Sequence, residues 1–377
     1  MKEQLPAEWN QFILKDVSFV NLMMRRIYNV LIVANPYDAF MLEDDGRVEE
    51  KIYNEYMELG LRYPPTFTQV STIQEAESVL ATVDIDLVIC MPGNADNDAF
   101  DVARAIKAKF SDIHCVVLTP FSYGITKRMA HENLSIFDYV FCWLGNTNLI
   151  LSIIKLMEDH MNLEHDIEEA GVQMILLVED SIRFYSSILP NLYTYILKQS
   201  QNFATEALNK HAATMRMRGR PKVVLARTYD EAWDIYMRFK DHCLGVISDV
   251  RYPIHPTEGK DRPSPLGDES PMDPEAGLKL LRAIRKEDEY VPLILESSEL
   301  ENREKAKAEH FHFVDKNSKK MGLDLYRLLE RHMGFGDFIF RDPKTYAEIM
   351  RVRNLKELQD NIFKIPNESM LYHVSRN

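Results

Sequence analysis

Six side chains that could take part in chemistry follow short apolar runs in the second half of the chain. If those runs are parallel strands, their carboxyl ends meet at one edge of a sheet, where ligands bind. Clustered carboxylates hold Mg²⁺, a carboxylate beside the metal can attack a phosphoryl group, and an amine neutralises phosphate charge. The pattern therefore predicts phosphoryl transfer onto an acid, at a site formed by Glu179, Asp180, Asp249, Ser297, Ser298 and Lys316.

Asp249 is the least expected of these groups. It ends the apolar run of "LGVISDVRYP" (244–253), and burying a charge is costly unless the charge is paired or binds a metal. An isolated aspartate at this place would more often cap the following loop. The acids and the amine at the ends of the other runs favour a functional site instead.

The elements that must position these residues are two sets of strand-like runs. Short β-branched runs alternate with longer amphipathic stretches, which is typical of a parallel sheet with crossover helices. The first set is 28–35, 67–72, 85–91, 113–119 and 137–143, and the second is 173–180, 222–228, 244–250, 291–298 and 311–317. We therefore predict an α/β fold of two tandem domains, each a five-stranded parallel sheet with helices on both faces.

The two sets repeat the same order and texture, so that "STIQEAESVLATVDIDLVI" parallels "RTYDEAWDIYMRFKDHCLGVI". We interpret 148–171 as the last helix of the first domain, which continues as an acidic, solvated connector. Beyond the second domain we expect a linker with a helix from about Lys344 to Ile362. The predicted segments are a helical extension (1–24), a first domain (25–147), the connector (148–171), a second domain (172–333) and the C-terminal linker and helix (334–377).

The first domain lacks the acids and the amine. The corresponding positions hold Ala34, Asn35, Met91 and Cys142, and only the hydroxyl of Thr119 is kept. Without carboxylates at those strand ends, neither metal binding nor acyl-phosphate formation by this route is expected. The remaining nearby acids are predicted to be solvated surface residues: Asp84, Asp86, Asp96 and Asp98.

The motifs "ILLVEDS", "GVISDV", "PLILESSE" and "FVDKN" resemble the receiver domain of two-component response regulators, which has a flavodoxin-like fold. By this resemblance, Asp249 is the phosphoacceptor and Asp180 is a direct Mg²⁺ ligand. Glu179 is then a second acid that acts mainly through water, and Arg251 supplies a backbone carbonyl to the metal. The first domain resembles a degenerate receiver, kept for packing or partner contact.

The same resemblance assigns the remaining positions. Ser297 corresponds to the switch hydroxyl, Ser298 to its small neighbour and Lys316 to the phosphate-binding lysine. Phe313 stands where receivers place a switch aromatic. Asn317 departs from the family, which usually has proline there.

Two connections in the second domain are unusually long, the crossover from 181 to 221 and the loop 251–274. The loop is rich in proline, so we expect no regular structure in it. It is either a flexible surface insertion or a lid or partner-binding loop over the site. His255 of this loop, and His310 and His312 elsewhere, are expected to be structural rather than ligands.

Composition excludes several classes. A net charge of −13 argues against a general nucleic-acid binder, and the basic stretch 210–222 is interpreted as a solvated helix end and turn. No apolar run could span a membrane, and the N-terminus lacks the pattern of a signal peptide. Cys90, Cys115, Cys142 and Cys243 lack metal-type spacing, so we expect buried, reduced thiols in a cytoplasmic protein.

The leading hypothesis is a phosphorylation-controlled module that uses Mg²⁺ and a phosphodonor histidine kinase or phosphotransfer protein. A second copy of the chain, in a homodimer, is a further candidate partner. A Mg²⁺-dependent phosphohydrolase is an alternative, although such enzymes usually carry an acid where Arg251 stands. A stand-alone response regulator or scaffold is another alternative. The stretch 21–47 and the tail resemble the front part of phosphoenolpyruvate synthase-like proteins, which implies control of a following ATP- and pyruvate-binding catalytic module. The chain itself is then not a classical enzyme.

Overall fold

The computed structural model of the 377-residue chain describes residues 21–40, 42, 47–59, 61, 63–91, 99–120, 137–205, 217–255, 272–333, 338–345, 347–352 and 360–374. The predicted extension 1–24 therefore lies largely outside the described residues, as does the middle of the loop 251–274.

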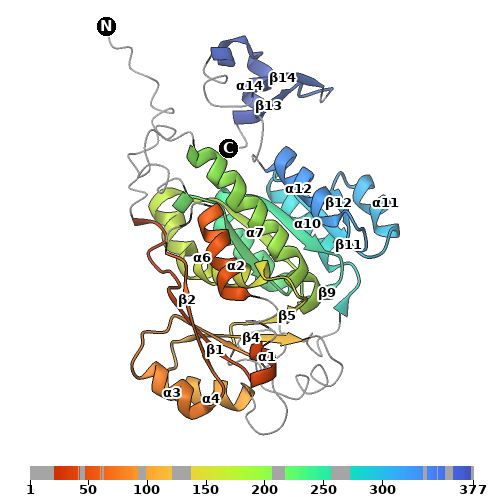
Figure 1. Ribbon diagram of the computed structural model, residues 1–377. Helices are drawn as coiled ribbons and strands as arrows, with labels where there is room; N and C mark the ends of the chain where they lie inside the picture. The colour runs from red at the N-terminus through yellow and green to blue at the C-terminus, as the bar shows by residue number, and fades with distance from the viewer. Residues whose placement is uncertain are drawn as a thin grey trace.

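Two five-stranded parallel sheets form the framework of the molecule (Figure 1). The strands of the first lie in the order β2-β1-β3-β4-β5, and every neighbouring pair is parallel. They are β1 (Asn29–Val33), β2 (Thr66–Val70), β3 (Leu87–Cys90), β4 (His114–Pro120) and β5 (Tyr139–Trp143).

The second sheet repeats this topology, since its order β7-β6-β8-β11-β12 matches that of the first, and all pairs are again parallel. Its strands are β6 (Met174–Val178), β7 (Lys222–Ala226), β8 (Cys243–Asp249), β11 (Leu293–Ser297) and β12 (His312–Asp315). This order is the flavodoxin-like one. The predicted fold class is confirmed.

Helices cover both faces of each sheet (Figure 1). Those of the first half are α1 (Pro36–Phe40), α2 (Val48–Glu58), α3 (Ile73–Leu80), α4 (Ala99–Lys109) and α6 (Asn148–Ala170). Those of the second half are α7 (Ile182–Thr205), α9 (Tyr229–Phe239), the short 3-10 helix η5 (Lys240–His242), α10 (Ala276–Glu287), α11 (Glu301–Ala308) and α12 (Met321–His332).

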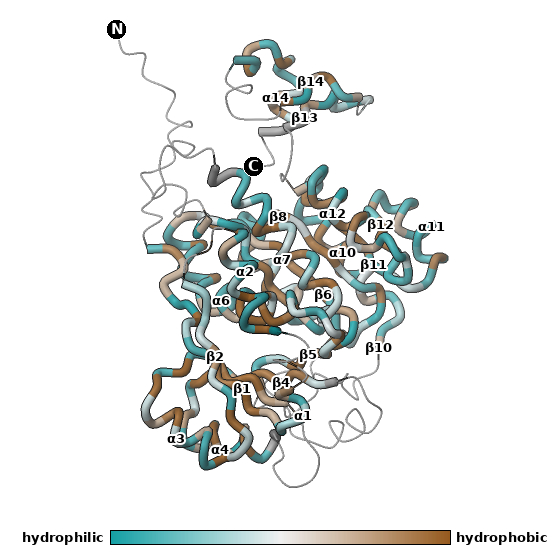
Figure 2. Tube along the Cα trace, in the orientation of Figure 1, coloured by the Kyte–Doolittle hydropathy of each residue, from teal (hydrophilic) through white to brown (hydrophobic). Residues whose placement is uncertain are grey.

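One hydrophobic core is continuous between the two sheets. It takes buried residues from α2, α6, α7 and α12 together with the strand faces that they cover. Separate apolar clusters lie under α3 and α4 on the first sheet and under α9 and α10 on the second. Figure 2 shows apolar segments along the strands of both sheets. The two domains are therefore packed together through α6 and α7.

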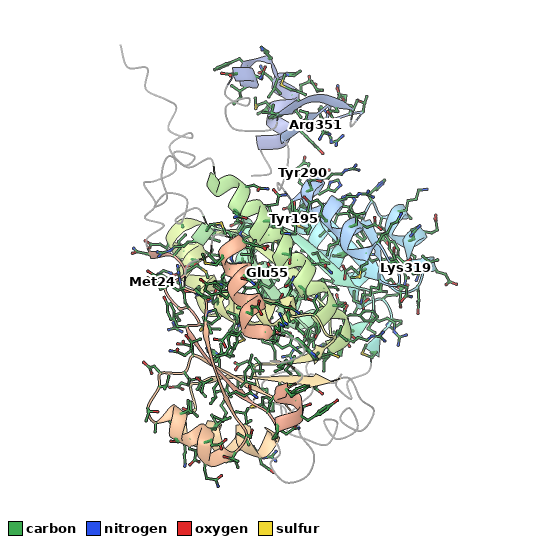
Figure 3. All side chains as sticks on the ribbon, viewed as in Figure 1. Met24, Glu55, Tyr195, Tyr290, Lys319 and Arg351 are labelled. Carbon is green, nitrogen blue, oxygen red and sulfur yellow. The ribbon has the colours of Figure 1, made fainter. Side chains whose placement is uncertain are left out.

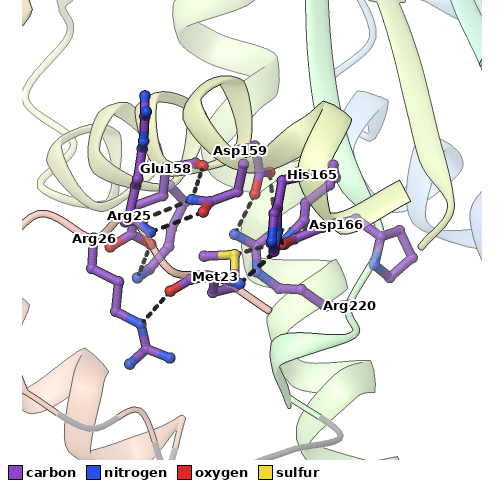
Figure 4. Close-up of polar contacts among 12 residues, drawn as sticks. Met23, Arg25, Arg26, Glu158, Asp159, His165, Asp166 and Arg220 are labelled. Carbon is purple, nitrogen blue, oxygen red and sulfur yellow. Dashed lines mark hydrogen bonds and ion pairs between the residues drawn. The ribbon is translucent and has the colours of Figure 1, made fainter. Parts of the chain in front are cut away.

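The connector is buried on the face that carries Asp159 and Asp166, so the expectation of a solvated connector was wrong for that face, whereas Glu164, Glu168 and Glu169 are exposed. Asp159 and Asp166 of α6 are fully buried, as is Lys222 of β7, and Arg220 is nearly so. Arg220 donates from its two terminal nitrogens to Asp159, at 3.0 and 2.6 Å, and Lys222 lies 2.7 Å from Asp166 (Figure 4). The acidic helix and the basic stretch before β7 neutralise each other, which also corrects the solvated interpretation of residues 220 and 222.

The polar residues of α6 also bind the backbone of the N-terminal segment. Asp166 accepts from the backbone N–H of Met23 at 3.1 Å, and Asn162 accepts from that of Arg25 at 2.9 Å (Figure 4). Glu158 accepts from the N–H of Ile27 at 3.3 Å. Buried polar groups cost free energy unless they are hydrogen-bonded, so these contacts fix the path of the segment into β1.

Helix α7 closes the free edge of the first sheet. The hydroxyl of Tyr185 donates to the carbonyl of Val140 in β5, and the N–H of Cys142 donates to Ser186 Oγ at 2.9 Å. These are main-chain groups of an edge strand, which would otherwise lack partners. At its other end, Tyr195 (Figure 3) packs edge-on against Tyr326 of α12, with 4.5 Å between ring centroids.

The internal repeat extends to helix capping. Thr72 accepts a hydrogen bond from the N–H of Glu75 at 3.2 Å, and Thr228 accepts one from Glu231 at the same distance. These threonines begin α3 and α9, the helices that follow the second strand of each domain. A threonine N-cap with an acid three residues later is the capping-box pattern, so the parallel between the two sequence stretches is a structural one.

The C-terminal segment is not the predicted helix. Strands β13 (Phe338–Arg341) and β14 (Glu348–Val352) form an antiparallel pair, followed by η6 (Ile362–Lys364) and α14 (Asn367–Val374). Phe340, Val352 and Ile365 form a small core of their own. β-Branched and aromatic residues outweighed the helical spacing that the sequence suggested. Tyr290, labelled in Figure 3, lies 6.3 Å from Tyr372 of α14, measured between ring centroids.

The ends of the loop 251–274 are paired, although no regular structure was expected. β9 (Tyr252–Pro253) and β10 (Met272–Asp273) form a two-residue antiparallel ladder. His255, beyond β9, lies 2.6 Å from Asp230. Among the described helices, none has the length and apolar character needed to cross a bilayer.

Candidate functional site

The carboxyl edge of the second sheet gathers the residues predicted from the sequence. Glu179 and Asp180 follow β6, Asp249 ends β8, and Lys316 follows β12. The strand register aligns Asp249 with Glu296 of β11. Parallel pairing therefore places side chains that are far apart in sequence at one edge.

Lys316 is the centre of this cluster. Its Nζ lies 2.8 Å from Asp249 Oδ1, forms an ion pair with Glu179 and lies 4.4 Å from the centroid of the Phe184 ring. Burial alone would lower the pKa of Lys316, but Glu179 and Asp249 outweigh burial and raise it. Burial raises the pKa of Glu179, and Lys316 opposes that shift. The ammonium is therefore held charged beside the carboxylate of Asp249.

Glu179, Asp180 and Asp249 could hold a divalent cation. Each offers a carboxylate oxygen, and these oxygens all lie within 4.8 Å of one another. Oxygen ligands about 2.1 Å from Mg²⁺ are at most about 4.2 Å apart, so small side-chain movements suffice for an octahedral site completed by water. The hard oxygen donors fit Mg²⁺. This is the one such group of three or more potential ligands among the described residues.

The position of Asp180 in this cluster raises its pKa. Burial, and then the negative charge of Asp249, raise the pKa of Asp180 to about 7. At neutral pH the carboxyl group is thus poised between its acid and its ionised form. A cation bound at this edge would favour the ionised form.

Glu296 was missed by sequence reasoning. It is fully buried, and neither carboxylate oxygen has a hydrogen-bond partner among the described residues. Burial raises its pKa to about 7, Lys316 counteracts this shift, and Asp249 adds to it. The sequence does carry a signal for a buried acid here, because "PLILES" is an apolar run interrupted by one acid. The predicted site instead included only Ser297 and Ser298 from this run.

Ser297 lies at the edge, but its described hydrogen bonds do not include one to Asp249. Its Oγ accepts from the N–H of Glu299 at 3.0 Å and from Asn302 Nδ2 at 2.9 Å. Its backbone carbonyl accepts from the N–H of Lys316 at 3.0 Å. The carbonyl of Ser298 accepts from Asn317 Nδ2 at 3.0 Å, so Asn317 ties the two loops together.

The other predicted positions lie around the cluster. Phe313 is half-buried in β12, and the guanidinium of Arg303 lies 5.3 Å from its ring centroid. Arg251 follows β8 with an exposed side chain. His312 stacks on His332 with 3.9 Å between centroids, which supports the structural interpretation of that histidine.

Gly277 is a second residue that sequence reasoning missed. A Cβ at this position would lie 1.9 Å from the backbone carbonyl oxygen of Asp249, and no atom fits at that distance. The N–H of Gly277 donates to the carbonyl of Val250 at 3.0 Å. The start of α10 can thus approach the backbone of Asp249 this closely because residue 277 has no side chain.

At the corresponding edge of the first sheet, the matched positions 34, 35, 91 and 142 carry no carboxylate. Ala34, Met91 and Cys142 are buried, and the side chain of Asn35 accepts from the N–H groups of Tyr37 and Asp38 in α1. Asn35 therefore acts in capping a helix. Cys90, Cys115 and Cys142 are buried free thiols and Cys243 is partly buried, in agreement with the burial expected for three of the four.

No protein-family model matches the chain, and no curated protein matches its sequence. Solved structures similar to this chain include response regulators and receiver domains. The response regulator TrrA of Thermotoga maritima with Mg²⁺ and BeF is 18% identical over 34% of this chain and 97% of that chain, with a TM-score of 0.26. The complex of the histidine kinase ThkA with TrrA gives 17% identity, 34% and 97% coverage and a TM-score of 0.26.

A third solved structure covers more of the chain. A putative two-component response regulator/GGDEF domain protein is 13% identical over 81% of this chain and 98% of that chain, with a TM-score of 0.31. The fold assignment rests on the strand order and the parallel register described above.

Proposed function

We propose that the second domain accepts a phosphoryl group on Asp249 with Mg²⁺ and thereby switches the contacts of the chain. The observation that carries this proposal is the position of Lys316, which is buried between Glu179 and Asp249 with its Nζ 2.8 Å from the acceptor. A lysine held there can neutralise a phosphoryl group on Asp249. The chain is then a phosphorylation-dependent regulatory module.

In the proposed reaction an oxygen of Asp249 attacks the phosphorus atom of a phosphodonor. A bond from Asp249 to phosphorus forms, the bond from phosphorus to the donor breaks, and its electron pair leaves with the donor group, which takes a proton from water. Mg²⁺ would be held by Asp180, Asp249, a water on Glu179 and the Arg251 carbonyl. When bound, it would neutralise the charge of the transferred phosphoryl group. Lys316 would exchange its contact with Asp249 for one with the phosphoryl oxygens.

The response to this step would begin at Ser297 and at α7. Drawing the Ser297 hydroxyl toward a phosphoryl group would take it from Asn302 and Glu299, and so loosen the start of α11 beside Phe313. On the other side, Phe184 contacts Lys316, and the next residue, Tyr185, bonds to the first domain. Movement of Lys316 would therefore alter the contacts between α7 and the first domain.

The experiment is hydrogen exchange on the full chain with Mg²⁺, with and without beryllofluoride as a phosphate mimic. We expect changed protection in residues 297–317 and at the start of α7. The Asp249→Asn variant, which keeps the shape of the acceptor, should show no response. Unchanged protection of the wild type with the mimic bound would refute the switch.

The phosphodonor that fits is a histidine kinase or phosphotransfer protein, since both present a phosphohistidine to an aspartate. On the sequence resemblance, the controlled activity is that of a phosphoenolpyruvate synthase-like catalytic module. The assay is ATP- and pyruvate-dependent phosphotransfer by the full-length product, native and Asp249→Ala, with and without phosphodonor. Activity that is the same for the native protein and for Asp249→Ala would favour a stand-alone regulator instead.

A further inference from the structure

A cleft lies outside the carboxylate cluster, where the N-terminal segment, α2, α6 and the residues before β7 meet. The space in it that the centre of a water molecule can occupy is about 60 Å³. One buried water needs roughly 10–15 Å³ on the same measure, so the cleft has room for a group of phosphate size. The cleft is partly open to solvent, so a larger moiety could extend from its rim.

The cleft is lined by cations. Arg26, Lys155, Arg218 and Arg220 contribute to the described lining, and Glu158 is its one acid. This composition stands out in a chain with a net charge of −13. Arg218 and Arg220 belong to the basic stretch that sequence analysis singled out and the proposed function does not use.

The cations differ in how they are engaged. Arg220 is committed to Asp159, and Lys155 lies 2.7 Å from Glu158. Arg26 forms no ion pair with any described residue; its Nε donates to the carbonyl of Met23 at 3.1 Å (Figure 4). This hydrogen bond anchors the guanidinium of Arg26 and leaves its two terminal nitrogens for a ligand.

Two aromatic rings stand at the rim. Tyr28 and Tyr63 also line the cleft, and they are 45% and 64% exposed. Their ring centroids are 6.4 Å apart in an edge-to-face arrangement. Exposed aromatic faces beside arginines are suited to a planar ring that carries a phosphate, because the ring stacks and the phosphate pairs with the guanidinium.

We propose that this cleft binds a nucleotide, with its phosphate against Arg26 and Arg218 and its base against Tyr63 or Tyr28. The site is independent of the phosphoryl-acceptor function of Asp249. It lies at the junction of the two domains, because α2 belongs to the first sheet and residues 217–220 lead into the second.

The test is calorimetric titration of the full chain at low salt with EDTA, which removes metal-dependent binding at the carboxylates. ADP and GDP are the probes, with pyrophosphate and adenosine as the phosphate-only and ring-only arms. We expect binding of a purine nucleotide that weakens at least about tenfold in Arg26→Ala/Arg218→Ala, because charge-assisted hydrogen bonds are lost. Tyr63→Ala should weaken it about fivefold to a hundredfold.

Matched variants keep the proposal open to refutation. Arg238→Ala removes an exposed arginine outside the cleft, paired with Glu164 on α6, and should leave binding unchanged. Asp249→Ala should also leave it unchanged, which separates this site from the acceptor. Arg26→Lys should retain part of the affinity. No binding of ADP, GDP or pyrophosphate at millimolar concentration, or binding that ignores Arg26 and Tyr63, would overturn the proposal.

Discussion

Replacing Arg220 by methionine should cost far more stability than replacing an exposed arginine that pairs with the same helix. Asp159 is fully buried and accepts from both terminal nitrogens of Arg220, from Tyr193 Oη at 2.8 Å and from the N–H of Val223 at 2.9 Å. Without the guanidinium, two of the four described donors to Asp159 and its ion-pair partner are lost. A buried ion pair broken on one side costs about 3–5 kcal/mol.

The matched control is Arg238→Met. Its partner Glu164 also lies on α6, but the two side chains are 58% and 56% exposed, and such pairs contribute only about 0–1 kcal/mol. Free energies of unfolding from urea titration would give the two differences. The double variant Asp159→Asn/Arg220→Met should recover part of the loss, since no buried charge remains unpaired. Similar small costs for Arg220→Met and Arg238→Met would refute the burial of this pair.

Three further outcomes are expected. Mg²⁺ affinity should rise with pH up to about 7 and then level off, because the raised pKa of Asp180 means that a proton must leave before the metal binds. Calorimetry at pH 5.5, 6.5 and 7.5 should show about a tenfold change in Mg²⁺ affinity per pH unit below 7. An affinity that does not change with pH would contradict this expectation. Gly277→Ala should reduce both stability and phosphorylation, since its Cβ collides with the Asp249 carbonyl; wild-type rates of phosphoryl uptake would show that the contact can relax. Tyr185→Phe should cost about 1–3 kcal/mol by leaving the Val140 carbonyl without its donor, and a thermal unfolding curve identical to wild type would contradict that contact.

The fold was predictable because its signals are local. Each strand is a short β-branched run, and each carboxylate of the site directly follows such a run, so parallel pairing alone brings Glu179, Asp249 and Lys316 to one edge. The N-cap threonines, Thr72 and Thr228, likewise mark the start of their helices in the sequence. These features can be recognised without knowing which helices and strands pack against each other.

The connector was not predictable in the same way. The acids of α6 and the basic stretch before β7 each look solvated when taken alone, because charged residues usually are. Only the fold shows that Asp159 meets Arg220 and that Asp166 meets Lys222. Long-range pairing of opposite charges leaves no periodic signal in a single sequence.

Glu296 and the C-terminal hairpin illustrate two other limits. An acid inside an apolar strand is visible in the sequence, but its isolation from hydrogen-bond partners is a property of three-dimensional packing. In the tail, apolar residues such as Ile349 and Val352 fit helical spacing as well as strand alternation, and pairing with β13 decides between them.

The central claim is that Asp249 alone is the phosphoacceptor. Intact mass of the full chain should be measured after incubation with Mg²⁺ and acetyl phosphate, for the wild type, for Asp249→Ala and for Asp230→Asn, an exposed acid of α9 that serves as the control. We predict one added phosphoryl group on the wild type and on Asp230→Asn, and none on Asp249→Ala. Retention of the label by Asp249→Ala, or no label on the wild type, would contradict the claim.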